Sequence, residues 1–336
     1  DIISDAFRDS GITIVIFDGV PSVPVVALIN ELYSLYRDRG YDAVISLGGD
    51  AVADTAKVLN IAVSGEPEDL ERCAGDDLME KPLKPFIMIP TLSGSGYETS
   101  RYAFFAGRAY ASHFLMPDIA VIDPRMCIAE DMMTAAASSL VALTHSVEAY
   151  VSPGKNPLTD GYTFPAIRFV MENMLNVIKN PRDKKGCLAL VNAHCMAGCA
   201  FSNIEAGIAH SLGKLIGDAS HVPHGICMGI LLPHALELQL SGDGGHIGDL
   251  LLPLAGFDVY AETPEEQRPQ KAVTVLYDLQ RDLYSASGGA IARTLEGVNV
   301  QKELLQDIAR KFLGHSSGGA DMHNCLKILE RAWEGR

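Results

Sequence analysis

The hydrophobic pattern of the chain changes near residue 127, and this change constrains the fold more than any other feature. Before it, short β-branched runs such as residues 11–17 alternate with segments of helical periodicity such as residues 25–39. After it, Ala, Met and Leu recur at intervals of three and four residues. Buried parallel strands with covering helices produce the first pattern, and consecutive helices produce the second. We predict an α/β domain over residues 1–127 and an all-helical domain over residues 128–336.

Composition narrows the classes of protein that the chain can belong to. Its 336 residues are 48% hydrophobic and 21% charged, which is enough to build two cores. The formal net charge of -15 disfavours binding to a phosphate backbone, so we expect no nucleic-acid partner. No apolar run approaches the ~18 residues of a membrane span, and we expect no membrane partner. None of the seven cysteines forms a Cys-x-x-Cys pair, so we expect reduced thiols and a cytoplasmic protein.

Two glycine-containing loops follow predicted strands in the first domain. A strand over residues 42–47 leads through Gly48 and Gly49 into a helix, and such a helix N-terminus presents backbone N–H groups to an anion. A tight turn of any α/β protein remains the alternative. The second loop, residues 90–100, is rich in Gly, Ser and Thr and follows a strand over residues 85–89. Together the loops favour contact with a phosphate or a ribose.

Four histidines lie close together in the second domain, among small and apolar residues. They are His210, His221, His224 and His234. An imidazole without a partner is costly to bury, so this concentration needs a reason. From the residues alone these side chains could be metal ligands, loop donors or helix ends. His145, on a predicted alanine-rich helix, would more often be a packed core residue.

Several motifs, taken in order, resemble the iron-containing alcohol dehydrogenases, which share the dehydroquinate synthase-like fold. They occupy residues 48–57, 90–98, 117–124, 142–150, 197–203 and 203–234. The resemblance covers essentially the whole chain. It implies hydride transfer between a nicotinamide cofactor and a small alcohol or aldehyde, next to a divalent metal at the domain interface. It also implies a homodimer or a larger assembly, and a first strand region that is absent from this sequence.

The resemblance assigns site residues to both domains. NAD or NADP would be bound by the positions that match Gly48, Gly49, Asp50, Ala51, Asp54, Thr91 and Ser95. The metal would be bound by the three histidines that match the family's ligands, His145, His210 and His224. The fourth ligand of the family is an aspartate, and Val141 stands at its position. Three neutral imidazoles without a carboxylate suit Zn²⁺, Ni²⁺ or Cu²⁺ better than Fe²⁺, so we expect a weak or empty metal site. Glu205 and Asp218 are the nearest carboxylates in sequence that could substitute.

Two further departures from the family pattern concern charge. Lys214 stands one turn after His210, where many members carry a histidine that is thought to relay a proton. A cation there opposes a bound dication, and we hypothesise that Lys214 is catalytic, as a donor to the substrate carbonyl oxygen. Asp50 replaces a family glycine, and its carboxylate would repel a pyrophosphate unless it points away.

Two alternative functions remain open from the sequence. Val141, Lys214 and Asp50 are also compatible with a non-catalytic member that only binds a nucleotide or another ligand. A lyase or cyclase of the dehydroquinate synthase type would use the same fold. Such enzymes need several Lys and Arg side chains around the metal, and only Lys214 stands in the histidine-rich stretch.

Overall fold

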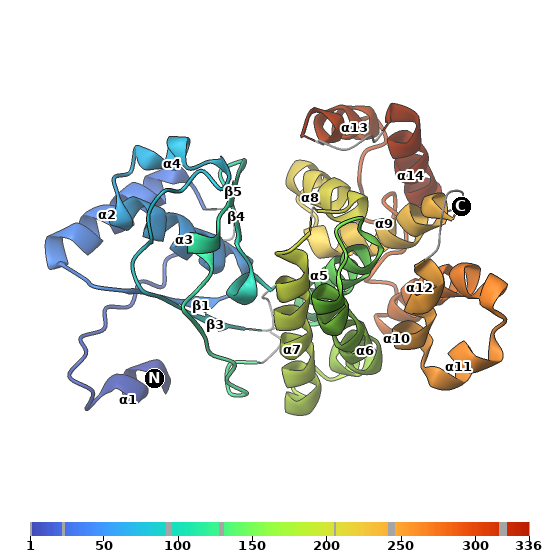
Figure 1. Cartoon of the computed structure of the whole chain (residues 1–336), viewed down its shortest axis with the longest axis horizontal. Helices are drawn as coiled ribbons and strands as arrows, with labels where there is room; N and C mark the ends of the chain where they lie inside the picture. The colour runs from blue at the N-terminus through green and yellow to red at the C-terminus, as the bar shows by residue number, and fades with distance from the viewer. Residues whose placement is uncertain are drawn as a thin grey trace.

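The protein consists of an α/β part and a helical part that lie side by side. The computed structural model describes residues 2–21, 24–91, 96–127, 131–204, 206–240, 246–315 and 321–335. In Figure 1 the first part runs from blue to teal and the second from green to red, with the two ends of the chain on opposite sides. The predicted fold class is confirmed.

A parallel sheet forms the centre of the α/β part. It consists of β1 (Val44–Gly48), β3 (Phe86–Pro90) and β6 (Ile119–Ala120), in that spatial order. The register places Val44 opposite Phe86 and Gly48 opposite Pro90, so the two glycine-containing loops begin at the same edge. Helices α2 (Val26–Arg39) and α3 (Asp50–Ser64) supply apolar side chains to its core.

The predicted strand over residues 11–17 is wrong. These residues form neither a helix nor a strand, and the side chains of Ile12, Val15 and Ile16 are 58%, 51% and 64% exposed. β-branched residues favour extended backbone, but a strand also needs a neighbour for its N–H and C=O groups. None of the described strands pairs with this segment.

Some elements of this part were not predicted. A small second sheet contains β2 (Gly75–Asp76), β4 (Tyr102–Phe105) and β5 (Arg108–Ala111). Short helices are α1 (Ile2–Phe7), α4 (Asp69–Arg72), η1 (Tyr97–Thr99) and η2 (His113–Leu115). Within the motif at residues 117–124, only Ile119–Ala120 pairs with β3.

The helical part follows the predicted periodicity closely. Its larger helices are α5 (Met132–Val151), α6 (Pro157–Lys179), α7 (Lys184–Phe201), α8 (Ile208–Ser220), α9 (His224–Gln239), α12 (Arg268–Ala286), α13 (Leu304–His315) and α14 (Met322–Glu334). Shorter ones are η3 (Ile247–Leu250), α10 (Leu251–Ala255), α11 (Phe257–Glu262) and η4 (Glu265–Gln267). α8 ends at Ser220, shortly before α9 begins at His224. No helix in the described ranges is long and apolar enough to cross a membrane.

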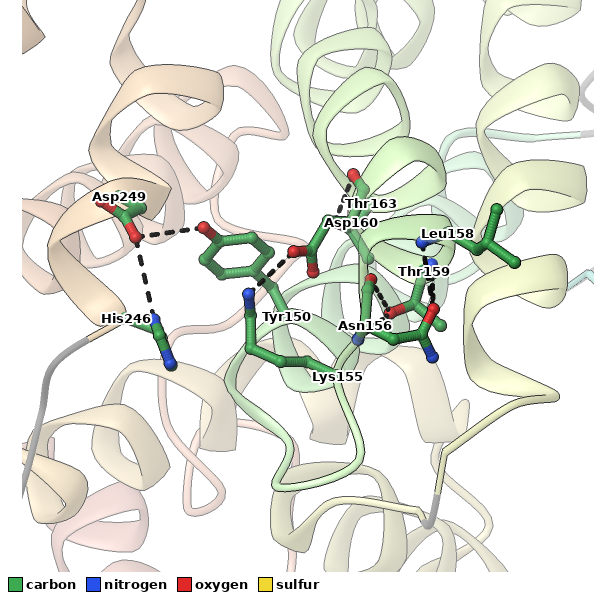
Figure 2. A network of polar contacts seen from close by, with 9 residues as sticks. All are labelled: Tyr150, Lys155, Asn156, Leu158, Thr159, Asp160, Thr163, His246 and Asp249. Carbon is green, nitrogen blue, oxygen red and sulfur yellow. Dashed lines mark hydrogen bonds and ion pairs between the residues drawn. The ribbon is translucent and has the colours of Figure 1, made fainter.

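A polar network holds the C-terminal end of α5, as Figure 2 shows. The Tyr150 hydroxyl donates to Asp249 Oδ2 at 3.1 Å. The Lys155 ammonium lies 4.4 Å from the centre of the Tyr150 ring and pairs with Asp160 Oδ2 at 2.8 Å. Asn156 caps the following helix, α6, through its side-chain oxygen. These contacts fix the end of the helix that carries His145.

Two glycines allow the α/β part and the helical part to meet. A Cβ on Gly198 of α7 would lie 2.1 Å from the Gly96 carbonyl oxygen, which no side chain could tolerate. Beside this contact, Thr99 Oγ1 donates to the Cys195 carbonyl at 2.7 Å, and Cys195 Sγ donates to Glu98 Oε1 at 2.9 Å. The backbones of η1 and α7 are therefore in direct contact.

Replacing Gly198 by alanine should loosen this joint. The new methyl group would force η1 away from α7, and we expect a loss of about 3 kcal/mol in the free energy of unfolding, measured by urea denaturation. Gly161→Ala in α6 is the matched control, because a Cβ there meets nothing within 4 Å. It should stabilise slightly, as alanine does in a helix. Equal effects of the two substitutions would contradict the proposed role of Gly198.

Candidate functional site

The carboxyl edge of the sheet gathers most of the predicted cofactor residues. β1 ends at Gly48, Gly49 is the N-cap of α3, and Asp50 and Ala51 begin that helix. The Thr91 N–H donates to the Gly48 carbonyl at 3.2 Å, which brings the two loops together. The first N–H groups of a helix have no partner within it, so this turn can bind an anion. Ser95, also predicted to contact the cofactor, lies outside the described residues.

Asp54 lies one turn further along α3 and faces β4. Its Oδ1 accepts a hydrogen bond from the Phe104 N–H at 2.8 Å. Burial raises the pKa of Asp54 to about 7, and the Lys214 ammonium acts in the opposite direction. The carboxyl is thereby directed at a strand of the second sheet and at Lys214.

Lys57 secures the same strand to α3. Its side chain is fully buried, and its ammonium donates to the carbonyls of Ser100 at 2.7 Å and Tyr102 at 2.8 Å. These carbonyl oxygens satisfy the hydrogen-bonding needs of the buried ammonium. Burial itself lowers the pKa of Lys57 to about 7. Asp54 and Lys57 together fix where Phe104 lies.

Two of the predicted metal ligands form a pair inside the helical part. His145 Nε2 of α5 lies 2.8 Å from His210 Nδ1 of α8, so one ring donates to the other. The Phe201 ring stacks on His145 with 4.1 Å between the ring centres. Burial lowers the pKa of His145 to about 3 and that of His210 well below its usual range. Both imidazoles are neutral at physiological pH.

Glu148 positions the second of these histidines. Its carboxyl accepts hydrogen bonds from the N–H groups of Ala209 at 2.7 Å and His210 at 3.2 Å, at the start of α8. A Cβ on Gly207 would lie 2.1 Å from Glu148 Cδ, so only glycine allows this approach. A carboxyl at a helix N-terminus satisfies donors that the helix itself leaves open. α5 therefore sets both the start of α8 and the place of His210.

The third predicted ligand, His224, faces the α/β part. It begins α9, and its Nε2 lies 3.4 Å from Asp50 Oδ2 of α3. Val141 is buried beside it: a Cβ on Gly225 would lie 2.9 Å from Val141 Cγ2. An aspartate at position 141 would thus lie next to the start of α9, and valine leaves this place without a carboxylate.

As arranged, these side chains do not fit a divalent metal centre. Within the described ranges, no three or more His, Cys, Asp or Glu side chains are grouped so that they could hold a metal ion. The predicted ligands are divided between the His145–His210 pair and the contact of His224 with Asp50. Of the two carboxylates considered as substitutes, Asp218 is exposed and Glu205 lies outside the described residues. The ligand set from the resemblance stays a prediction.

A small cavity adjoins the histidine pair. Its lining consists of Tyr97, Ser100, Phe104, His145, Gly198, Phe201 and His210. The Lys214 ammonium lies 4.1 Å from the centre of the ring of Phe104, one of these lining residues. The sequence did not single out the three aromatic residues, because an aromatic residue in a strand or helix is by default a core residue.

The comparison with known families is decisive at this point. Residues 1–124 match the family described as iron-containing alcohol dehydrogenase, and residues 135–324 match the description Fe-containing alcohol dehydrogenase family, C-terminal. The chain belongs to the iron-containing alcohol dehydrogenase family. The resemblance drawn from the motifs is confirmed.

Individual relatives agree with this assignment. A lactaldehyde reductase of Escherichia coli K12 is 27% identical over 344 residues, which cover 98% of this chain and 87% of the relative. A 1,3-propanediol dehydrogenase of Citrobacter freundii is 28% identical over 72% of this chain, and the match spans only 64% of that protein's length. An alcohol dehydrogenase structure from Oenococcus oeni aligns with a TM-score of 0.90 at 24% identity, covering 98% of this chain and 86% of the other.

The buried carboxyl of Glu148 predicts a dependence of stability on pH. Burial raises its pKa from the ordinary 4.5 to about 7, so folding favours the protonated form. This contribution is fully present below about pH 4.5 and is lost as the pH rises through about 7, by up to about 3 kcal/mol. Glu148→Gln should remove it, so the wild type should lose more stability than the variant between acidic and mildly alkaline pH. Parallel curves in urea denaturation would contradict the assignment.

Proposed function

We propose that this protein is an NAD(P)-dependent oxidoreductase that interconverts a small alcohol and the corresponding aldehyde. One observation carries the proposal: Asp50, at the anion-binding turn of α3, lies 3.4 Å from His224 of the helical part. A cofactor with its diphosphate at that turn would lie at the interface with the helical part that carries the histidines. Membership of the family supports the same reaction.

The α/β part offers a binding place for the nicotinamide dinucleotide. We propose that Gly48, Gly49, Ala51 and Thr91 contact the diphosphate, since they lie at the carboxyl edge of adjacent parallel strands. A relative from Bacillus methanolicus, 29% identical over 73% of this chain, is named as an NAD-dependent methanol dehydrogenase. This supports a nicotinamide cofactor without deciding between NAD and NADP.

The cavity beside the histidine pair is small, and we propose that it widens to admit the reacting end of a short, uncharged substrate. Tyr97, Phe104 and Phe201 give it aromatic walls, and these walls exclude water from the reacting carbonyl group. The bound nicotinamide supplies or accepts the hydride. His145 and His210 are neutral, and the one N–H that their mutual hydrogen bond leaves over is available to orient the substrate oxygen. The names of the lactaldehyde reductase and the 1,3-propanediol dehydrogenase fit substrates of this size.

Turnover of short aldehydes should be measurable directly. The purified protein is mixed with NADH or NADPH and a panel containing acetaldehyde, propionaldehyde and lactaldehyde, and the reduced-nicotinamide absorbance is followed. We expect it to decline with at least one aldehyde. If either dinucleotide binds but no aldehyde is reduced, the non-catalytic reading of the family fold holds instead, and the proposed reaction is wrong.

Asp50 should weaken cofactor binding. Its carboxylate stands at the turn where we propose that the diphosphate binds, and like charges repel. We expect Asp50→Gly to lower the Kd for the reduced cofactor about tenfold, or about 1.4 kcal/mol, in a fluorescence titration. Asp50→Asn removes the charge but keeps the size of the side chain, and it should give most of the decrease in Kd. An unchanged or raised Kd in both variants would contradict the placement of the diphosphate.

A further inference from the structure

We propose that Lys214 polarises the substrate oxygen in place of the family's metal ion, and that Asp54 and Phe104 position it for this task. The inference rests on the proposed hydride transfer. Three features support it: the uncharged Val141, the carboxylates of Asp50 and Asp54 on α3, and the contact of Lys214 with Phe104 of the cavity lining.

Residues of the α/β part hold the Lys214 side chain in place. Its ammonium lies 4.1 Å from the centre of the Phe104 ring, an arrangement in which the ring face attracts a cation. Phe104 is held in turn, because its N–H donates to Asp54 Oδ1 at 2.8 Å. Lys57 anchors the neighbouring Tyr102 carbonyl to the same helix. A cation on a flexible side chain is thus confined next to the cavity.

The charges on the two sides of the interface are complementary. Asp50 and Asp54 are four residues apart in α3 and therefore share one face of the helix. Asp50 contacts His224. The charge of the Lys214 ammonium lowers the pKa of the Asp54 carboxyl, against the effect of burial, which raises it. Asp50 and Lys214 both depart from the family pattern, and they lie on opposite sides of the same interface. Asp50 adds a negative charge to one side of the interface, and Lys214 adds a positive charge to the other.

The histidines are engaged in other contacts. His145 and His210 are bonded to each other, and His224 is directed at Asp50. Val141 supplies no anion to offset the charge of a dication, and the Lys214 ammonium lies on the ring of Phe104, which lines the same cavity as His145 and His210. A metal ion at the three histidines would add to this positive charge, and the Asp50 carboxylate beside them is engaged with His224. The same positive charge is well placed to stabilise a developing alkoxide.

The chemical step balances without a metal. In the reducing direction, the hydride carries two electrons from the nicotinamide ring to the carbonyl carbon, and the carbonyl π electrons move to the oxygen. The Lys214 ammonium donates a hydrogen bond to this oxygen and then its proton, giving the alcohol and the oxidised cofactor. Water returns a proton to the amine. In the oxidising direction the neutral amine accepts the hydroxyl proton.

The first test removes the charge and restores it. With propionaldehyde, NADH and NADPH as probes, Lys214→Met should lower kcat about 100-fold or more while the Kd of the cofactor stays within about twofold. Lys214→Arg should recover part of the activity, because it keeps a cation near Phe104. Asp54→Asn keeps an acceptor for the Phe104 N–H and should lower kcat more than it changes KM. Circular dichroism and thermal unfolding check that each variant is folded.

The second test needs no activity. The double variant Val141→Asp, Lys214→His rebuilds the family's carboxylate and removes the cation, so it should bind one Co²⁺ with the visible absorption of a protein-bound ion. The wild type and Lys214→Arg should not show this absorption under the same conditions. Stoichiometric Co²⁺ binding by the wild type, at least as tight as in the double variant, would overturn the proposal.

The outcomes separate this inference from the proposed function. Wild-type turnover that survives exhaustive dialysis against EDTA and is lost in Lys214→Met supports both. Turnover that is abolished by EDTA and restored by Zn²⁺ or Fe²⁺, or that is kept within about threefold in Lys214→Met, leaves the reductase in place and rejects the role of Lys214. Absence of turnover with every aldehyde and both cofactors rejects the reaction and the role of Lys214 together.

Discussion

The close approach of Gly96 to Gly198 is the constraint on which the site depends. Because neither residue has a side chain, η1 lies directly on α7, and the carboxyl edge of the sheet comes within reach of α8 and α9. The contact of Asp50 with His224 and that of Phe104 with Lys214 both cross the resulting interface. A wider joint would leave a solvent-filled gap, in which charges are screened and neither contact would persist.

The distribution of charge at this interface departs from what the resemblance predicts. Position 141, where the resemblance predicts a ligand carboxylate, is a buried valine, and the acidic residues Asp50 and Asp54 lie on α3. Buried charges are stable only with partners, so a carboxylate, an imidazole and an ammonium must be arranged as a set. The histidines from the family motif are all present, but the surroundings no longer hold them as one cluster of donors within the described chain.

The sequence predicted the elements whose signals are local. Helical periodicity predicted consecutive helices after residue 127, as α5, α6 and α7 show, and the glycine turn correctly placed the start of α3. The strand over residues 11–17 failed because its β-branched pattern cannot show whether another strand lies beside it. The site was predictable only in part for a similar reason. The motifs single out His145, His210 and His224 as predicted ligands, whereas the direction of each ring depends on partners such as Asp50 that are distant in sequence.

The contact between Glu148 and Gly207 has an evolutionary consequence. The Glu148 carboxyl packs against Gly207 and accepts a hydrogen bond from the Ala209 N–H at the start of α8. A substitution at either position therefore affects the other. A side chain at position 207 would be tolerated only after Glu148 had been shortened, and a shorter residue at 148 would leave α8 with open donors. Descendants of this chain should therefore keep both residues or exchange them together, whatever substrate they come to prefer.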